Sequence, residues 1–220
     1  MPEWDAVVVG SGPNGLVAAV ELVRAGWKVL VLEGADTAGG GTRTAELTLP
    51  GFRHDVCSAI HPLGMASPAF RDLGLERVGV SWIQPDAPLA HALQPGRSVI
   101  QERSLDATAE RLGDDGRAWR RLMGPGVRAG LGLVDSLLQP LSLPPAHPLA
   151  LARYGLPGLR SASSLGRARF RGDDAPALLA GLAGHSMLSL DAPITAGFGM
   201  LLGQLAHVVG WPMPAGGSQA

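Results

Sequence analysis

The sequence has a single cysteine, Cys57, among its 220 residues. One thiol excludes a disulfide within the chain and a zinc site built from several cysteines. A surplus of positive charge is also missing, because 18 Lys and Arg residues and 19 Asp and Glu residues give a formal charge of −1. General nucleic-acid binders are more basic than this, so we expect no nucleic-acid partner.

Long apolar runs are absent as well. No stretch reaches the ~18 uninterrupted apolar residues of a membrane span, and the nearest one, residues 194–210, contains Gln204 and His207. The first apolar run, residues 6–9, starts too close to the N-terminus to be the core of a secretory signal. These absences predict a cytoplasmic protein and leave peripheral contact with a membrane surface open. The composition, 46% apolar and 17% charged, is typical of one large or two small globular domains.

Residues 5–33 contain the most regular pattern in the sequence. A β-branched run at residues 5–9 predicts a fully buried parallel strand, residues 16–24 have the spacing of an amphipathic helix, and residues 28–33 predict a second buried strand. Between the first strand and the helix lie three glycines at positions i, i+2 and i+5: Gly10, Gly12 and Gly15.

Each of these glycines has a separate use in a phosphate-binding turn. Gly10 permits the tight turn, Gly12 lets a pyrophosphate approach the backbone, and Gly15 lets the helix pack closely on the strand. Glu33 lies 23 positions after Gly10, near the ~20 at which an acid accepts hydrogen bonds from a ribose. A carboxylate there repels a 2′-phosphate, so the pattern indicates a dinucleotide other than NADP. The alternative is a chance glycine turn between two core strands.

A second glycine-rich stretch follows Glu33, with the run Gly39 to Gly41 and then Arg43. The order of these elements resembles the signature of glutathione-reductase-like flavoproteins. That signature is a strand, a Gly-x-Gly-x-x-Gly turn, a helix, a strand ending in Glu, and then a glycine pair with an arginine. This group includes amine oxidases and carotenoid desaturases. The resemblance implies that the glycines let a loop pass close to the FAD pyrophosphate and that Arg43 adds positive charge. The family often has arginine directly after the pair, where this chain has Gly41; the alternative is an ordinary flexible loop.

Four further stretches narrow the resemblance to the phytoene-desaturase-like branch: residues 7–16, 49–60, 170–186 and 210–218. The fold implied is α/β, a Rossmann-like FAD-binding domain with an inserted α+β substrate domain. FAD is the implied cofactor. The residues expected to bind it are Gly10, Gly12, Pro13, Asn14, Gly15, Glu33, Gly39, Gly40, Gly41 and Arg43.

The resemblance also implies how the chain is divided. We expect residues 1–65 to begin the FAD-binding domain, residues 66–209 to form a segment of the substrate domain, and residues 210–220 to start the return to the FAD-binding domain. The family's adenine-side strand and C-terminal glycine motif are not in the sequence. We therefore expect a truncated chain that is inactive by itself.

The reaction implied is transfer of a hydride between a small apolar or polyene-like substrate and flavin N5. His54, Cys57 and His61 are expected near the flavin, where a histidine can act as acid or base. The simpler interpretations are that His54 lies on the surface, that Cys57 is a small buried apolar residue and that His61 ends its element. No catalytic residue is therefore assigned. The histidines have no metal-ligand spacing, which predicts no metal. An amine-oxidase-like flavoprotein and an inactive dinucleotide-binding fragment are the alternatives, and the oligomeric state is open.

The second half of the chain offers fewer signals. We expect one helix over residues 106–123 capped by Asp106, no regular helix in the proline-rich residues 137–159, and Asp173 with Asp174 as a helix cap. His185 is expected to be a core histidine rather than the lining of a substrate cavity. A cluster of arginines predicts a solvated face or contact with anionic lipid headgroups: Arg167, Arg169 and Arg171.

Overall fold

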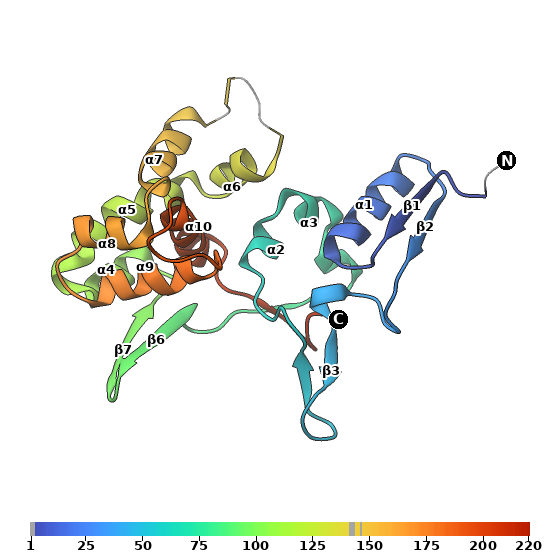
Figure 1. The fold of residues 1–220 in the computed structure, drawn as a ribbon, viewed down its shortest axis with the longest axis horizontal. Coiled ribbons are helices and arrows are strands. Elements are labelled where there is room, and N and C mark those ends of the chain that lie inside the picture. The colour runs from blue at the N-terminus through green and yellow to red at the C-terminus, as the bar shows by residue number, and fades with distance from the viewer. Residues whose placement is uncertain (1–2, 141–143, 146) are drawn as a thin grey trace. The chain divides into compact units, whose positions relative to one another are not determined.

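The computed structural model describes residues 3–140, 144–145 and 147–220. The chain forms two compact units (Figure 1). The first comprises residues 1–61, 69–83 and 213–220, and the second residues 62–68 and 84–212. The sequence predicts boundaries at residues 65 and 209, whereas in the structure residues 69–83 pack with the first unit.

The first unit begins with the expected strand, helix and strand: β1 (Ala6–Val9), α1 (Pro13–Arg24) and β2 (Val29–Leu32). The two strands pair in parallel with Ala6 opposite Val29. The helix ends in a Schellman motif, since Gly26 N–H donates to Val23 O at 2.9 Å and Trp27 N–H donates to Leu22 O at 3.1 Å. Gly26 has φ +87°, so glycine serves at this helix end as the sequence predicts.

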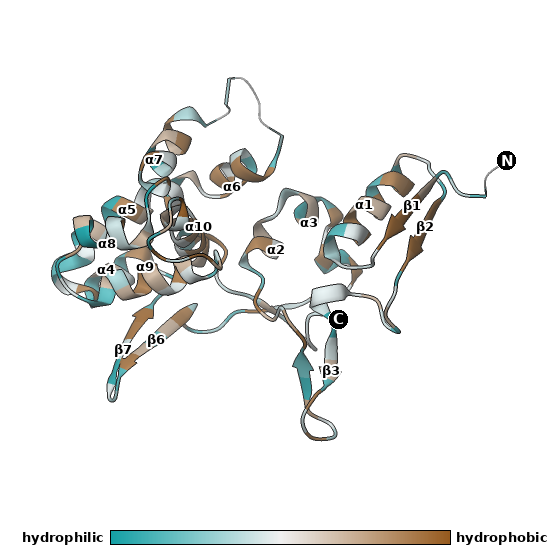
Figure 2. Cartoon of the chain, in the orientation of Figure 1, coloured by the Kyte–Doolittle hydropathy of each residue, from teal (hydrophilic) through white to brown (hydrophobic). Residues whose placement is uncertain are grey.

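Burial of the two strands differs from the expectation. Val7 is 54% exposed, Val9 83% and Leu32 48%, so the prediction of fully buried strands is wrong for the described chain. The reason is that β1 and β2 form a two-stranded sheet, and alternate side chains of a strand point to opposite faces. Figure 2 shows both strands as apolar.

Two further strand pairs complete the first unit. β3 (Thr44–Glu46) pairs antiparallel with β4 (Arg53–Asp55), where the sequence predicts extended segments. β5 (Trp82–Ile83) pairs antiparallel with β8 (Met213–Pro214), which brings the last residues of the chain to the first unit. The short elements are η1 (Gly40–Thr42), α3 (Pro68–Leu73) and η2 (Leu75–Val78).

The second unit is mostly helical and has one hairpin. β6 (Leu89–Gln94) and β7 (Arg97–Gln101) pair around the predicted turn, where Gly96 has φ +76°. The helices are α2 (Pro62–Ala66), α4 (Leu105–Arg111), η3 (Gly113–Asp115), α5 (Gly116–Ala129), α6 (Leu131–Leu138), α7 (Pro148–Gly158), α8 (Ala162–Arg169), α9 (Asp174–Gly184) and α10 (Thr195–Val208).

Helix α10 lies in the core of the second unit. Trp119, Met123, Leu182 and Met200 are buried in one apolar cluster. α10 approaches its neighbours closely because it carries small residues. A Cβ on Gly203 would lie 3.0 Å from Met123 Cε, so a larger residue there would displace the core.

Two helix predictions in the second unit are wrong. The expected helix over residues 106–123 is divided into α4 and α5, because Gly113 has φ +55° and interrupts it. Ser104, not Asp106, is the N-cap, and its hydroxyl accepts a hydrogen bond from Ala107 N–H at 3.2 Å.

The proline-rich residues 137–159 were expected to contain no regular helix, yet α7 lies within them. Pro148 is compatible with the helix because it lies in the first turn, where its missing N–H has no helical acceptor. Pro157 lies inside the last turn, so its missing N–H removes one hydrogen bond only at the helix end. Residues 141–143 and 146 of this stretch lie outside the described residues. Among the helices that the structure describes, none is long and apolar enough to cross a membrane.

Candidate functional site

The first glycine turn connects β1 to α1. Gly10 has φ +96°, and its N–H donates to Leu32 O at 2.7 Å, which ties the turn to the end of β2. A Cβ on Gly15 would lie 2.2 Å from Gly10 O, so the close packing expected of this position is present. Both positions therefore require glycine, one for its backbone angle and the other for space.

The turn leaves the N-terminus of α1 without a cap. Gly12 is the N-cap residue and has no side chain to accept a hydrogen bond, Pro13 occupies the first turn, and no acidic residue lies in that turn. The first N–H groups of a helix have no acceptor within the helix. Together with the positive end of the helix dipole, the N–H groups of Asn14 and Gly15 form an arrangement that favours an anion.

The second glycine stretch folds back onto this helix end. Gly39 has φ +118°, and its N–H donates to Ser11 O at 3.0 Å. Gly40 has φ +54°, and a Cβ on it would lie 2.9 Å from Gly12 Cα. The structure thus brings together the two glycine-rich segments that the sequence analysis assigned to the same pyrophosphate.

Arg43 is hydrogen-bonded within its own loop. Its Nε donates to Gly40 O at 3.0 Å, and Thr42 Oγ1 donates to Gly39 O at 2.7 Å. These two bonds hold the loop in shape. Gly41 lies on the exposed side, and a Cβ there would meet Cys57 only at 3.9 Å. Among the predicted residues, Arg43 positions the loop and Gly41 has no close backbone contact.

Glu33 follows β2 and lies beside the first turn. Its Oε2 accepts hydrogen bonds from Ser11 N–H at 2.9 Å and Ser11 Oγ–H at 2.5 Å, and its Oε1 accepts one from Ala35 N–H at 2.9 Å. The bonds from Ser11 are the main cause that lowers the pKa of this exposed carboxyl to about 2. The carboxylate is ionised at neutral pH, and the lowered pKa keeps it so well into the acid range.

Ser11 is the residue that sequence reasoning missed. It is buried, its carbonyl accepts from the second glycine loop, and its N–H and hydroxyl bind Glu33. It therefore joins the turn, the loop and the acid. The signal that could have found it is its place between Gly10 and Gly12, directly before the helix.

A polar cluster lies beside the second glycine loop, where the end of the chain packs on β3 and β4. Asp55 Oδ1 accepts from Ser218 N–H at 2.8 Å and from Thr44 Oγ1 at 2.7 Å. Burial alone would raise the pKa of Asp55, but these bonds lower it below its ordinary value. Gln219 Nε2 donates to Ala38 O at 3.3 Å, so residues 218–219 contact both the hairpin and the loop.

The residues expected near the flavin differ in their exposure and in their hydrogen-bond partners. His61 is half-buried, its Nε2 lies 2.7 Å from Ser218 Oγ, and burial lowers its pKa. His54 is exposed and contacts Thr48 Oγ1 at 2.8 Å. Cys57 is exposed, so the expectation of a buried apolar cysteine is wrong. Within the described residues, no group of three or more His, Cys, Asp or Glu side chains could hold a metal ion.

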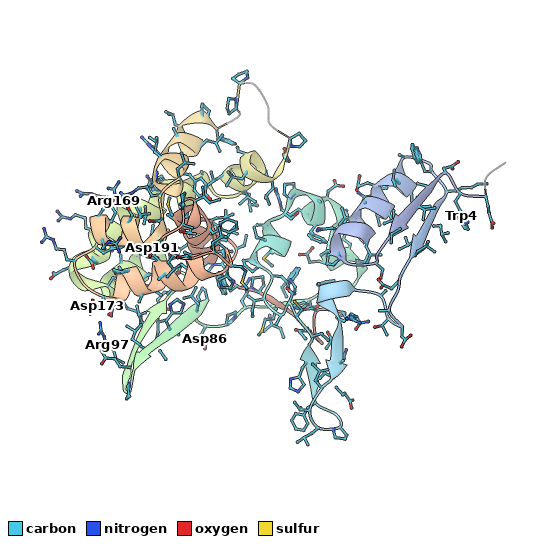
Figure 3. All side chains as sticks on the ribbon, viewed as in Figure 1. Trp4, Asp86, Arg97, Arg169, Asp173 and Asp191 are labelled. Atoms are coloured by element: carbon cyan, nitrogen blue, oxygen red, sulfur yellow. The ribbon has the colours of Figure 1, made fainter. Side chains whose placement is uncertain are left out.

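The candidates in the second unit also differ from expectation. His185 is exposed and packs edge-on to Trp211 with ring centroids 5.6 Å apart, so the prediction of a core histidine is wrong. Asp173 is the N-cap residue of α9 but makes no side-chain cap bond, and Asp174 pairs with Arg97 instead. Figure 3 shows Arg97 on the hairpin near Asp173 at the start of α9.

The residues of the first unit fit a dinucleotide pyrophosphate. A side chain on Gly40 would fill the space beside Gly12, and the adjoining end of α1 has no side-chain cap and no acidic residue in its first turn. Glu33 is exposed at the end of β2, where an adenosine ribose can reach it.

Comparison with known families decides the fold. Residues 8–73 match the NAD(P)-binding Rossmann-like domain. This unit is Rossmann-like. The match covers the turn, α1, β2 and both glycine stretches of the Rossmann-like unit, in agreement with the fold predicted from the sequence.

Individual proteins resemble parts of the chain. A limonene dehydrogenase chain of Castellaniella defragrans is 35% identical over 110 residues, which are 50% of this chain and 20% of that protein. All-trans-retinol 13,14-reductase of Danio rerio is 52% identical over 65 residues, 30% of this chain and 10% of that protein. The solved structure of wild-type putrescine oxidase bound to putrescine has a TM-score of 0.60 at 21% identity and covers 98% of this chain.

The chain spans 47% of that putrescine oxidase and a fifth or less of the two sequence relatives. Their names are those of a dehydrogenase, a reductase and an oxidase, which agrees with the predicted oxidoreductase class. The likeness to putrescine oxidase shows the fold alone. The narrower phytoene-desaturase-like branch stays a prediction.

Proposed function

We propose that this chain supplies the dinucleotide-binding part of an FAD-dependent oxidoreductase. The observation that carries the proposal is the contact between Gly12 and Gly40 at the uncapped N-terminus of α1. Two backbone segments without side chains, next to N–H groups that have no acceptor in the helix, form a surface that a pyrophosphate can approach closely.

Bound FAD would supply the redox chemistry, with a hydride moving between a substrate carbon and flavin N5. The first-turn N–H groups of α1 would hold the pyrophosphate, and Arg43 would keep the second loop in place through Gly40 O. Glu33 would accept hydrogen bonds from the adenosine ribose, and the bonds from Ser11 hold its carboxylate in place. Its negative charge would reject a 2′-phosphate, which favours FAD over NADP.

For the substrate we propose a small apolar or polyene-like molecule, as in phytoene-dehydrogenase-like enzymes. Two relatives support an apolar substrate, because they are named for limonene and all-trans-retinol, which are both apolar isoprenoids. An amine is the second candidate, supported by the fold shared with putrescine oxidase. No described side chain is assigned as catalytic, because His61 lies in a hydrogen-bonded structural cluster.

The cofactor proposal is tested with the full-length protein by flavin absorbance after purification and by titration with FAD. Gly12→Ala is the decisive variant. Gly12 has φ −69°, and its Cβ would lie 3.9 Å from Gly40 Cα, so alanine fits the fold but narrows the space for the pyrophosphate. We expect FAD affinity to fall by about tenfold or more.

Gly155→Ala in α7 is the matched control, since a Cβ there meets nothing within 4 Å. Wild-type affinity in Gly12→Ala would reject the site. A colourless wild-type protein that takes up no FAD would instead support an inactive dinucleotide-binding fragment. The substrate class is tested by loss of flavin absorbance under anaerobic conditions with isoprenoids in one arm and primary amines in the other.

A further inference from the structure

Residues 216–219 lie against the hairpin of β3 and β4 in the first unit, although they follow the second unit in the sequence (Figure 1). Gly217 has φ +100°, and a Cβ on it would lie 2.6 Å from Thr44 Oγ1 and 3.1 Å from Asp55 Oδ1. The position therefore requires glycine both for its backbone angle and for space. The segment is in close contact with the hairpin at this point.

Ser218 fastens the same segment to the chain beside the second glycine loop, residues 39–43. Its N–H donates to Asp55 Oδ1 at 2.8 Å, and its hydroxyl donates to Ser58 O at 2.6 Å. Because the hydroxyl proton is used in this bond, the oxygen accepts from His61 Nε2–H at 2.7 Å. Ser58 N–H in turn donates to Gly41 O at 2.9 Å. Ser218 is thus linked to the loop through Ser58.

Gln219 contacts both ends of the second glycine loop with one side chain. Its Oε1 accepts from Thr44 N–H at 3.0 Å, and its Nε2 donates to Ala38 O at 3.3 Å. Ala38 and Thr44 directly precede and follow residues 39–43. A backbone N–H can only donate and a backbone oxygen can only accept, so the two ends require one group that does both. The carboxamide of glutamine is such a group.

We propose that Gln219 is a positioning residue for the cofactor: its carboxamide ties the two ends of the second glycine loop together and so keeps Gly40 against Gly12 at the N-terminus of α1. Arg43 and Thr42 make hydrogen bonds inside the loop, to Gly40 O and Gly39 O, but they do not join its ends. This role rests on the proposed function, because the loop would contact the pyrophosphate of FAD.

The loop needs such a tie because it contains three consecutive glycines, Gly39 to Gly41. Glycine has more backbone conformations available than any other residue, so a loop of this composition loses much entropy when it is ordered. A contact that orders the loop before the cofactor arrives reduces this cost of binding. Loss of the contact should therefore weaken FAD binding without any change in the groups that touch FAD.

The experiment compares Gln219→Met with the wild type in the full-length protein. Methionine is close to glutamine in length and cannot donate a hydrogen bond. We expect FAD affinity to fall by about tenfold, the combined effect of two neutral hydrogen bonds. Competition by ADP should weaken by the same factor, because ADP carries the pyrophosphate without the flavin. Gln94→Met, at an exposed glutamine of β6, is the matched control and should bind FAD as the wild type does.

Hydrogen exchange without FAD measures the tie by itself. In Gln219→Met the Thr44 amide loses its acceptor, so exchange in the peptide spanning residues 38–46 should become faster, by about tenfold at that amide. A general loss of thermal stability without this local change would mean that Gln219 supports the fold and does not position the loop, which overturns the proposal.

The two levels of the proposal fail in different ways. A wild-type protein that takes up no FAD rejects the proposed function and the role of Gln219 toward FAD together, and the exchange of Thr44 then shows only whether the tie exists. A wild-type protein that binds FAD while Gln219→Met binds it equally well overturns the role of Gln219 alone. Weaker FAD binding with unchanged ADP competition assigns the effect to the flavin end and also overturns that role.

Discussion

The backbones of Gly12 and Gly40 touch: a Cβ added to Gly40 would lie 2.9 Å from the Cα of Gly12. The two residues are 28 positions apart and belong to different loops. Their contact closes one side of the space above the N-terminus of α1. The contact requires glycine at positions 12 and 40 and a left-handed backbone conformation at Gly40.

Gly40→Ala should therefore disturb both the loop and the cofactor site. Gly40 has φ +54°, and the added methyl meets the backbone of Gly12, which cannot rotate away. We expect a loss of about 1–3 kcal/mol of stability and weaker FAD binding. Gly41→Ala is the control, because its nearest neighbour is Cys57 at 3.9 Å. Thermal unfolding and FAD titration of both variants measure the effect; similar behaviour of the two would contradict it.

Acid should weaken the first unit through Glu33. The folded pKa of about 2 lies below the ordinary 4.5, so the ionised carboxylate stabilises the fold above pH 4.5 and that contribution is lost as the pH falls toward 2. Glu33→Gln should be less stable than the wild type at neutral pH, and the difference should shrink over this range. The unfolding free energy as a function of pH is the measurement. A constant difference down to the lowest pH would exclude the Ser11–Glu33 bonds as its cause.

The first strands, the first helix and one hairpin were predictable, whereas the division of residues 106–123, the helix α7 and the long-range contacts were not. β1, α1 and β2 follow from periodicity, and the hairpin of β6 and β7 follows from its Pro-Gly turn. Ser11 binds Glu33, which is 22 positions away, and Ser218 binds Asp55, which is 163 positions away. No repeating pattern in the sequence indicates either contact.

Burial was the other failure of sequence reasoning. His185 looked like a core residue because its neighbours are apolar, but it follows the last residue of α9 and is exposed. The valines of β1 looked buried because β-branched runs usually are. In both cases the composition of the segment was apolar. The exposure of a side chain depends instead on which other elements pack against that segment.

Two helix glycines should respond to alanine in opposite directions. A Cβ on Gly116, at the start of α5, would lie 2.0 Å from the backbone oxygen of Ala109, so Gly116→Ala should destabilise the second unit by about 1–3 kcal/mol. Gly155 lies in α7 and has open space around it, so Gly155→Ala should stabilise by roughly 0.5–1 kcal/mol. Chemical denaturation with two-state analysis separates the two, and destabilisation by Gly155→Ala would contradict the packing described for α7.

The stability of the second unit should also fall in mild acid because of His207. This histidine is buried, with Nδ1 3.1 Å from Arg103 O and Nε2 3.1 Å from Gln101 Nε2. The arrangement requires the neutral ring, in which Nδ1–H donates to the carbonyl and Nε2 accepts from the amide. Protonated Nε2 would set an N–H against an NH₂ group that already donates to Gly203 O at 2.7 Å.

Burial, assisted by the positive charge of Arg103, lowers the pKa of His207 below the ordinary 6.5. The unfolded chain therefore takes up the proton first, so stability is complete above pH 6.5 and declines as the pH falls below it. His207→Gln should remove this decline, because glutamine does not titrate. The check is the unfolding free energy of the wild type and the variant from neutral pH down to about pH 5, the lower limit of the range in which histidine usually titrates. Parallel curves for the two proteins would mean that His207 does not titrate between the folded and unfolded states, and the hydrogen-bonding scheme would have to be abandoned.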